Sequence, residues 1–145
     1  MGDIAALAAL ALSAFTSATL LPGTSEAALV GLLALGETAA WLAILVATVA
    51  NVAGSAVNWG IGRYLVRFRD HPRFPVSRER YARTEALYRR WGVASLLLSW
   101  TPIVGDPLTV VAGVMRTPLL LFLPIVVLAK GGRYVAVAAL AEGLL

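Results

Sequence analysis

The fold depends on one polar interruption of an apolar run, Ser99-Trp100-Thr101-Pro102-Ile103-Val104-Gly105-Asp106-Pro107. The interruption places the carboxylate of Asp106 between two prolines, and proline interrupts or starts helices. In a soluble protein such a segment predicts a surface turn. Here both flanking segments are strongly apolar. The same residues therefore predict a break in a membrane-buried helix, where a carboxylate is costly and usually functional.

The composition favours a membrane protein. Of 145 residues, 59% are hydrophobic and 14% are charged, whereas about 25% are charged in soluble domains. Twelve of the twenty charged residues lie between Arg63 and Arg90, which leaves long apolar tracts on both sides. This pattern is typical of an integral membrane protein with one hydrophilic loop. Membrane topology explains the basic residues, so we do not expect nucleic acid as a partner.

The sequence gives little support for metal, cofactor or catalytic chemistry. It has no cysteine, and its one histidine, His71, lies in the polar loop without a second histidine or a carboxylate cluster. We therefore expect no metal site and no cofactor. Gly105-Asp106 lacks the first glycine of the Gly-x-Gly-Asp motif of intramembrane aspartyl proteases, and there is no nucleotide-binding loop. We expect no enzymatic activity.

The apolar segments predict an all-α integral membrane protein. Residues 38–65 and 117–143 are long enough to span the bilayer. Residues 92–116 divide into two half-length pieces, which predicts a re-entrant hairpin in which Asp106 caps the second piece and Pro107 is its first residue. The single domain, residues 1–145, is thus predicted to contain hairpin 4–36, transmembrane helix 38–65, cytoplasmic loop 66–91, hairpin 92–116 and transmembrane helix 117–143.

The first segment allows two interpretations. Residues 4–36 divide at Pro22-Gly23, and Thr24 or Ser25 can cap the helix that follows. Residues 4–21 could cross the bilayer alone or form half of a hairpin. They lack the basic start of a signal peptide, so we expect them to be retained.

The hydrophilic loop, residues 66–91, contains eight arginines and three acidic residues. The positive-inside rule places such a loop in the cytoplasm. Tyr81, Thr84, Tyr88 and Trp91 recur at helical spacing, which favours a short amphipathic helix in the headgroup region. A plain topology loop is the alternative.

Polar residues recur within both predicted spanning helices. A stripe on residues 38–65 is either a packing face or the wall of a solvated cavity. Its members share one face because they are three or four residues apart: Thr48, Asn51, Ser55, Asn58 and Gly62. In the last span, Lys130 and Arg133 need a partner or water. Arg133 and Tyr134 could instead extend to the interface.

The two halves of the chain match at two points. Glu26 and Asp106 each follow a proline by four residues. The motifs Gly62-Arg63-Tyr64 and Gly132-Arg133-Tyr134 then close the next span in each half. Together the matches predict an inverted-topology repeat, a common transporter plan with the site near the midplane. The repeat favours a hairpin for residues 4–36.

The residues that carry these patterns resemble the DedA superfamily (the SNARE-associated or VTT domain), and most closely its short YqaA-like branch. The resemblance rests on residues 17–26, 51–64, 99–107 and 130–134. It implies two facing re-entrant hairpins in the bacterial inner membrane, embedded acidic and basic residues needed for activity, and a proposed role in proton-dependent lipid translocation. Undecaprenyl phosphate and phosphatidylethanolamine are substrates proposed across the superfamily. Larger members carry Ser-Arg-Phe-x-Pro-x-x-Arg at the second hairpin, whereas this chain has Trp100 at the first arginine and Gly105-Asp106 near the second.

We expect an inner-membrane protein that links proton binding at Glu26 and Asp106 to translocation of a lipid or lipid phosphate. Membrane lipids are then its partners, and self-association into a homo-oligomer is a further hypothesis. The candidate proton and substrate pathway comprises Glu26, Asp106, Arg63, Lys130, Arg133, Asn51 and Asn58, with hairpin tips at Pro22, Gly23, Pro102, Gly105 and Pro107. The alternative is a membrane scaffold whose polar hairpin residues serve only packing.

Overall fold

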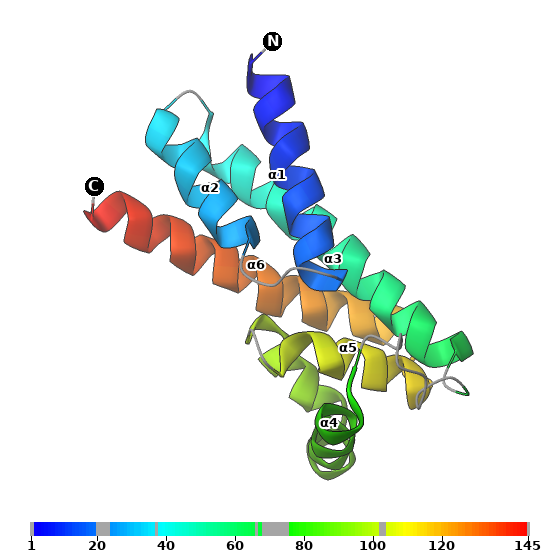
Figure 1. The fold of residues 1–145 in the computed structure, drawn as a ribbon. Coiled ribbons are helices and arrows are strands. Elements are labelled where there is room, and N and C mark those ends of the chain that lie inside the picture. The colour runs from blue at the N-terminus through cyan, green and yellow to red at the C-terminus, as the bar shows by residue number, and fades with distance from the viewer. Residues whose placement is uncertain are drawn as a thin grey trace.

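A computed structural model describes residues 2–19, 24–36, 38–65, 67, 76–101 and 104–144. All regular elements in these ranges are helices (Figure 1). They are α1 (Gly2–Thr19), α2 (Thr24–Leu35), α3 (Ala40–Leu65), α4 (Arg78–Trp91), the 3-10 helix η2 (Gly92–Trp100), α5 (Gly105–Val114) and α6 (Leu119–Leu144). The predicted hairpin-tip positions Pro22, Gly23 and Pro102, and the loop residue His71, lie outside the described residues.

Two long helices organise the fold. By length and composition, α3 and residues Leu119–Ala141 of α6 could each cross a membrane, and they coincide with the two segments predicted to span it. They pack on one another and run in opposite directions (Figure 1). The short helices pack on these two.

The side chains of α3 are distributed as expected for a helix that faces lipid. Its entire predicted polar stripe is buried: Thr48, Asn51, Ser55, Asn58 and Gly62. Its exposed large side chains are hydrophobic or aromatic: Trp41, Leu45, Val49, Val57, Tyr64 and Leu65. Trp41 and Tyr64 lie about 34 Å apart along the helix at 1.5 Å per residue. This separation matches the aromatic belts at the two edges of a bilayer whose hydrocarbon core is about 30 Å thick.

The short helices contact the long ones in matching pairs. Helix α1 packs on α3, and η2 packs on α6. Helix α2 contacts α6, and α5 contacts α3; α1 also contacts α2, as η2 contacts α5. If α1, α2 and α3 are matched in order with η2, α5 and α6, these contacts correspond in the two halves, whereas the contact of α2 with α3 has no counterpart of similar extent between α5 and α6.

Two glycines allow α3 and α5 to approach closely. A carbon atom added to Gly62 would overlap the carbonyl oxygen of Val110. In the reciprocal direction, a carbon added to Gly113 would overlap the carbonyl oxygen of Trp59. The two backbones are therefore in direct contact at this crossing, and no larger residue fits at either position.

Helix α4 packs against α5 and η2. Its buried side is formed by Tyr81, Thr84 and Tyr88, and Ser77 caps its N-terminus by accepting a hydrogen bond from the Arg80 backbone at 3.3 Å. The predicted stripe is thus correct for its first three members. Trp91, in contrast, is 60% exposed, because the helix ends there and Gly92 takes a positive φ of 63°.

Two local predictions about the hairpins differ from the structure. The sequence predicts an N-cap at Asp106, but α5 begins at Gly105 and Val104 holds the cap position without a side-chain hydrogen bond. The carboxylate of Asp106 contacts Lys130 instead. In the first half Ser25, predicted as an alternative cap, lies within α2 and bonds to Tyr134. Both side chains have long-range partners that replace the local cap.

Candidate functional site

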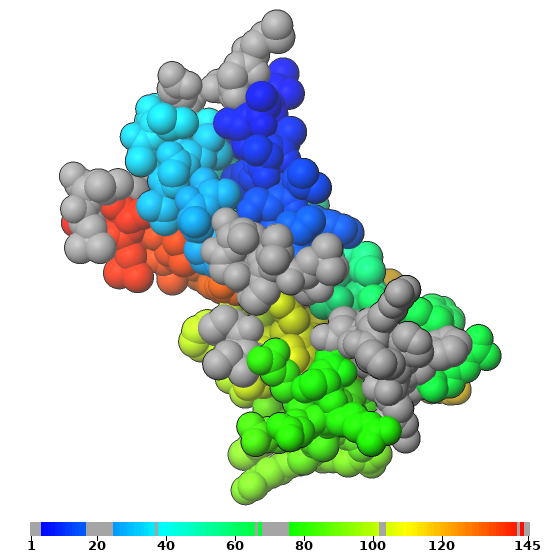
Figure 2. Space-filling view, viewed as in Figure 1, coloured from blue at the N-terminus to red at the C-terminus, as the bar shows by residue number. Residues whose placement is uncertain are grey.

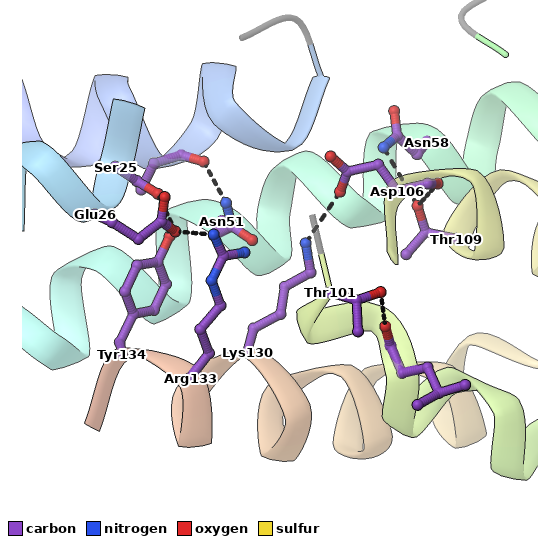
Figure 3. Close-up of polar contacts among 12 residues, drawn as sticks. Ser25, Glu26, Asn51, Asn58, Thr101, Asp106, Thr109, Lys130, Arg133 and Tyr134 are labelled. Carbon is purple, nitrogen blue, oxygen red and sulfur yellow. Dashed lines mark hydrogen bonds and ion pairs between the residues drawn. The ribbon is translucent and has the colours of Figure 1, made fainter. Parts of the chain in front are cut away.

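Four charged side chains from three helices form two ion pairs (Figure 3). Arg133 of α6 pairs with Glu26 in the first turn of α2. One helical turn earlier, Nζ of Lys130 lies 3.3 Å from Oδ1 of Asp106, in the first turn of α5. Because the two cations are three residues apart, they share one face of α6. This face of α6 therefore pairs with an acidic residue in the first turn of α2 and with another in the first turn of α5.

The two cations lie in the interior of a predicted spanning helix, α6. Lys130 is 2% exposed, and the side chains of Arg133 and Glu26 are each 19% exposed. Burial of a charge costs several kcal/mol unless it is paired. The pairing explains how α6 retains both cations near its middle. The interface position predicted as an alternative for Arg133 is wrong, because its guanidinium contacts Glu26.

A hydroxyl chain extends the Glu26–Arg133 pair. The hydroxyl of Tyr134 donates to Oγ of Ser25 at 2.8 Å, and this Oγ donates to Oε1 of Glu26 at 3.1 Å. Tyr134 is 1% exposed, so its predicted alternative position at the interface is also wrong. This role of Ser25 was not predicted from the sequence. The other oxygen of Glu26, Oε2, is buried without a hydrogen bond from the described residues.

The two asparagines of α3 hold short helices in place. Nδ2 of Asn51 donates to the carbonyl oxygen of Ala14 in α1 at 2.6 Å. Nδ2 of Asn58 donates to Oγ1 of Thr109 in α5 at 3.3 Å, and this hydroxyl donates to the backbone carbonyl of Asp106 at 2.6 Å. Asn58 therefore connects to the turn that carries Asp106. The role of Thr109 was not predicted from the sequence.

Arg63 does not join the ion pairs. It lies in the last turn of α3, with its guanidinium 5.2 Å from the ring centre of Tyr64. Within the described residues, Arg63 forms no ion pair with Glu26 or Asp106. The predicted equivalence of the two Gly-Arg-Tyr motifs is wrong. One motif ends α3, whereas Gly132-Arg133-Tyr134 lies in the middle of α6. A three-residue match does not fix the height of a motif along its helix.

The two described hairpin-tip residues lie at the junction of η2 and α5. Gly105 and Pro107 are both buried in the first turn of α5. A carbon added to Gly105 would overlap the carbonyl oxygen of Ser99. Only glycine therefore allows the end of η2 to lie this close to the start of α5. Within the described ranges, no group of three or more histidine, cysteine or acidic side chains is placed to hold a metal ion.

Comparison with known proteins identifies the family. The profile of the VTT domain matches residues 21–142, which include the four charged residues of the two ion pairs. The chain belongs to the VTT-domain (DedA) family. This VTT-domain protein is 42% identical over 142 residues to inner membrane protein YqaA of Escherichia coli (strain K12), covering 96% of this chain and 93% of the relative. The inner membrane protein YqaA of Shigella flexneri matches to the same extent.

A protein of Haemophilus influenzae is 38% identical over 141 residues, which cover 92% of this chain and 86% of that protein. No solved structure matches this VTT-domain protein. The description of the two YqaA relatives as inner membrane proteins supports a bacterial inner-membrane location. The exposed apolar and aromatic side chains of α3 agree with that location. The resemblance drawn from residues 17–26, 51–64, 99–107 and 130–134 is thereby confirmed.

Proposed function

We propose that this protein links proton binding to the translocation of a lipid or lipid phosphate across the bacterial inner membrane. One observation carries the proposal: two carboxylates on separate short helices pair with two cations on a single turn of α6. Charged groups within membrane segments commonly mark ion or substrate pathways. The starts of α2 and α5, where unpaired backbone N–H groups favour anions, converge at the same place.

The proposal includes the predicted architecture. In it, α1–α2 and η2–α5 are re-entrant hairpins of an inverted repeat, and the loop 66–91 is cytoplasmic. The matching contacts of the two halves support the repeat. The length of α5 supports the re-entrant hairpin, because ten residues extend only about 15 Å, half of a bilayer core.

The chemistry rests on competition for the same cations. While Asp106 is ionised, it occupies Lys130; a proton on its carboxylate removes that charge and leaves Lys130 available to an anion. A lipid phosphate can then take the place of the carboxylate, and its departure favours release of the proton. Arg133 and Glu26 allow the same exchange, and the planar guanidinium can bind two phosphate oxygens at once. Proton transfer and phosphate movement are thereby linked.

The test uses proteoliposomes with a pH gradient and a fluorescently labelled phospholipid. We expect Glu26→Gln and Asp106→Asn each to reduce gradient-driven translocation at least about tenfold, the usual minimum effect of losing a buried charge-assisted hydrogen bond. Glu79→Gln, at an exposed position of α4, is the matched control and should leave the rate unchanged.

Translocation by both Glu26→Gln and Asp106→Asn at the wild-type rate and with the wild-type dependence on the gradient would refute the mechanism. A lower yield of folded protein with an unchanged rate per molecule would favour the scaffold alternative. Translocation that is normal in rate but independent of the gradient in both variants would support the assignment of the two carboxylates as proton carriers.

A further inference from the structure

The arginines of α4 are unevenly distributed around the helix. At 100° per residue, one side carries Arg80, Arg83, Arg90 and Trp91, which we call the α4 arginine face. All four residues are exposed. Glu85 lies on the opposite side, where it pairs with Arg89 at 3.0 Å. This face therefore carries three of the five arginines of α4, with Glu79 at its N-terminal edge, and the other two, Arg78 and Arg89, lie on the side of Glu85.

The end of this face combines a cation with an exposed indole. The guanidinium of Arg90 lies 5.5 Å from the ring centre of Trp91, and Trp91 is 60% exposed. Tryptophan is enriched where protein meets the membrane interface, because its ring is apolar and its N–H is polar. The stacked guanidinium keeps its charge available to phosphate oxygens at the same depth.

The chain that follows becomes apolar. Helix η2 begins directly after Trp91, and it exposes Leu97, Leu98 and Trp100. At about 2 Å per residue, Leu97 lies roughly 12 Å beyond Trp91. The exposed surface thus changes from arginine to aromatic to aliphatic over about half a leaflet, the order in which a bilayer presents phosphates, interface and acyl chains.

The orientation of α4 suits the same surroundings. In Figure 1 the long helices are seen from the side and α4 nearly along its axis, so α4 runs across them. Its side chains form the surface at one end of the molecule (Figure 2, bright green). A helix that lies across two spanning helices runs along the membrane plane. Its arginines can then contact several headgroups at once.

We propose that the α4 arginine face binds the headgroups of anionic phospholipids in the leaflet at that end of the protein. This site is separate from the ion pairs on α6, so it does not depend on the proposed translocation. Each arginine near an anionic membrane surface contributes about fivefold to binding. Loss of two arginines should therefore weaken binding about 25-fold.

The test measures lipid binding to the full-length protein in a neutral detergent by native mass spectrometry. The probes are dioctanoyl phosphatidylglycerol, which is anionic, and dioctanoyl phosphatidylcholine, which is not. We expect the wild type to prefer phosphatidylglycerol. The double variant Arg83→Gln/Arg90→Gln should lose at least about tenfold of that affinity, with binding of phosphatidylcholine unchanged.

The matched control is Arg78→Gln/Arg89→Gln, which removes the same charge from the other side of α4 and should weaken phosphatidylglycerol binding less than about threefold. Equal weakening by the two double variants, or no preference in the wild type, would overturn the proposal. If Arg83→Gln/Arg90→Gln does not fold, the single variants Arg83→Gln and Arg90→Gln decide the question, since each should lose about fivefold. Arg83→Lys/Arg90→Lys should retain the preference.

Discussion

Replacement of Gly62 by alanine tests the contact that joins α5 to α3. The added carbon would overlap the carbonyl oxygen of Val110 and lie 2.9 Å from both its carbonyl carbon and the nitrogen of Val114. Non-bonded carbon atoms prefer about 3.5–4.0 Å, and relief of the overlap with the Val110 oxygen needs the larger movement, so the helices must separate by more than about 1 Å. Helix α5 is buried throughout 107–113, so the separation weakens contacts along the whole crossing. Such overpacking costs about 1–3 kcal/mol.

The control is Gly60→Ala, two residues earlier on α3, where an added carbon meets nothing within 4 Å. Both substitutions gain up to about 1 kcal/mol of helix propensity, so their difference isolates the steric cost. Unfolding by SDS, followed by circular dichroism, should show Gly62→Ala to be less stable than Gly60→Ala by about 1–3 kcal/mol. Gly113→Ala should behave like Gly62→Ala. Equal stability of Gly60→Ala and Gly62→Ala would refute the close contact.

Two further substitutions test the polar contacts of α6 and α3. Lys130→Met leaves Asp106 without its cation and should lower the free energy of unfolding by about 3 kcal/mol. This is the low end for a broken buried pair, because the side chain of Asp106 remains 30% exposed. Adding Asp106→Asn should recover most of the loss in the same unfolding assay, and no recovery would contradict the pairing. Trp59→Phe removes the indole N–H that donates to the carbonyl oxygen of Thr117 at 2.9 Å and should cost about 1–2 kcal/mol. An unchanged unfolding midpoint for Trp59→Phe would show that this bond contributes nothing.

Hydropathy and length predicted the long helices closely. The predicted spans 38–65 and 117–143 correspond to Ala40–Leu65 and Leu119–Leu144. These features are local, because a run of apolar residues and its length are both visible in sequence. The burial of the α3 stripe followed from the same local geometry, since residues three or four apart share a face.

The partners of the polar residues could not be predicted in this way. Asn51 bonds to a backbone carbonyl 37 residues away, and every residue offers such an acceptor. The assignment of Lys130 to Asp106 and of Arg133 to Glu26 depends on the heights at which α2 and α5 meet α6. Arg63 was placed in the pathway by a motif match, but α3 passes the turn of Asp106 at Asn58, five residues before Arg63. Long-range packing determines these heights, and sequence spacing alone does not.

The contacts also assign different roles to the two long helices. Helix α3 holds its neighbours by neutral bonds and close packing: Asn51 holds α1, while Asn58 and Gly62 hold α5. Helix α6 holds α2 by the charge of Arg133 and the hydroxyl of Tyr134. Among the described residues, Lys130–Asp106 is the ion pair that connects α6 to the α3–α5 unit. Under the proposed function, a proton on Asp106 would therefore weaken the connection between these two groups of helices, while the Asn58 and Gly62 contacts kept α5 on α3.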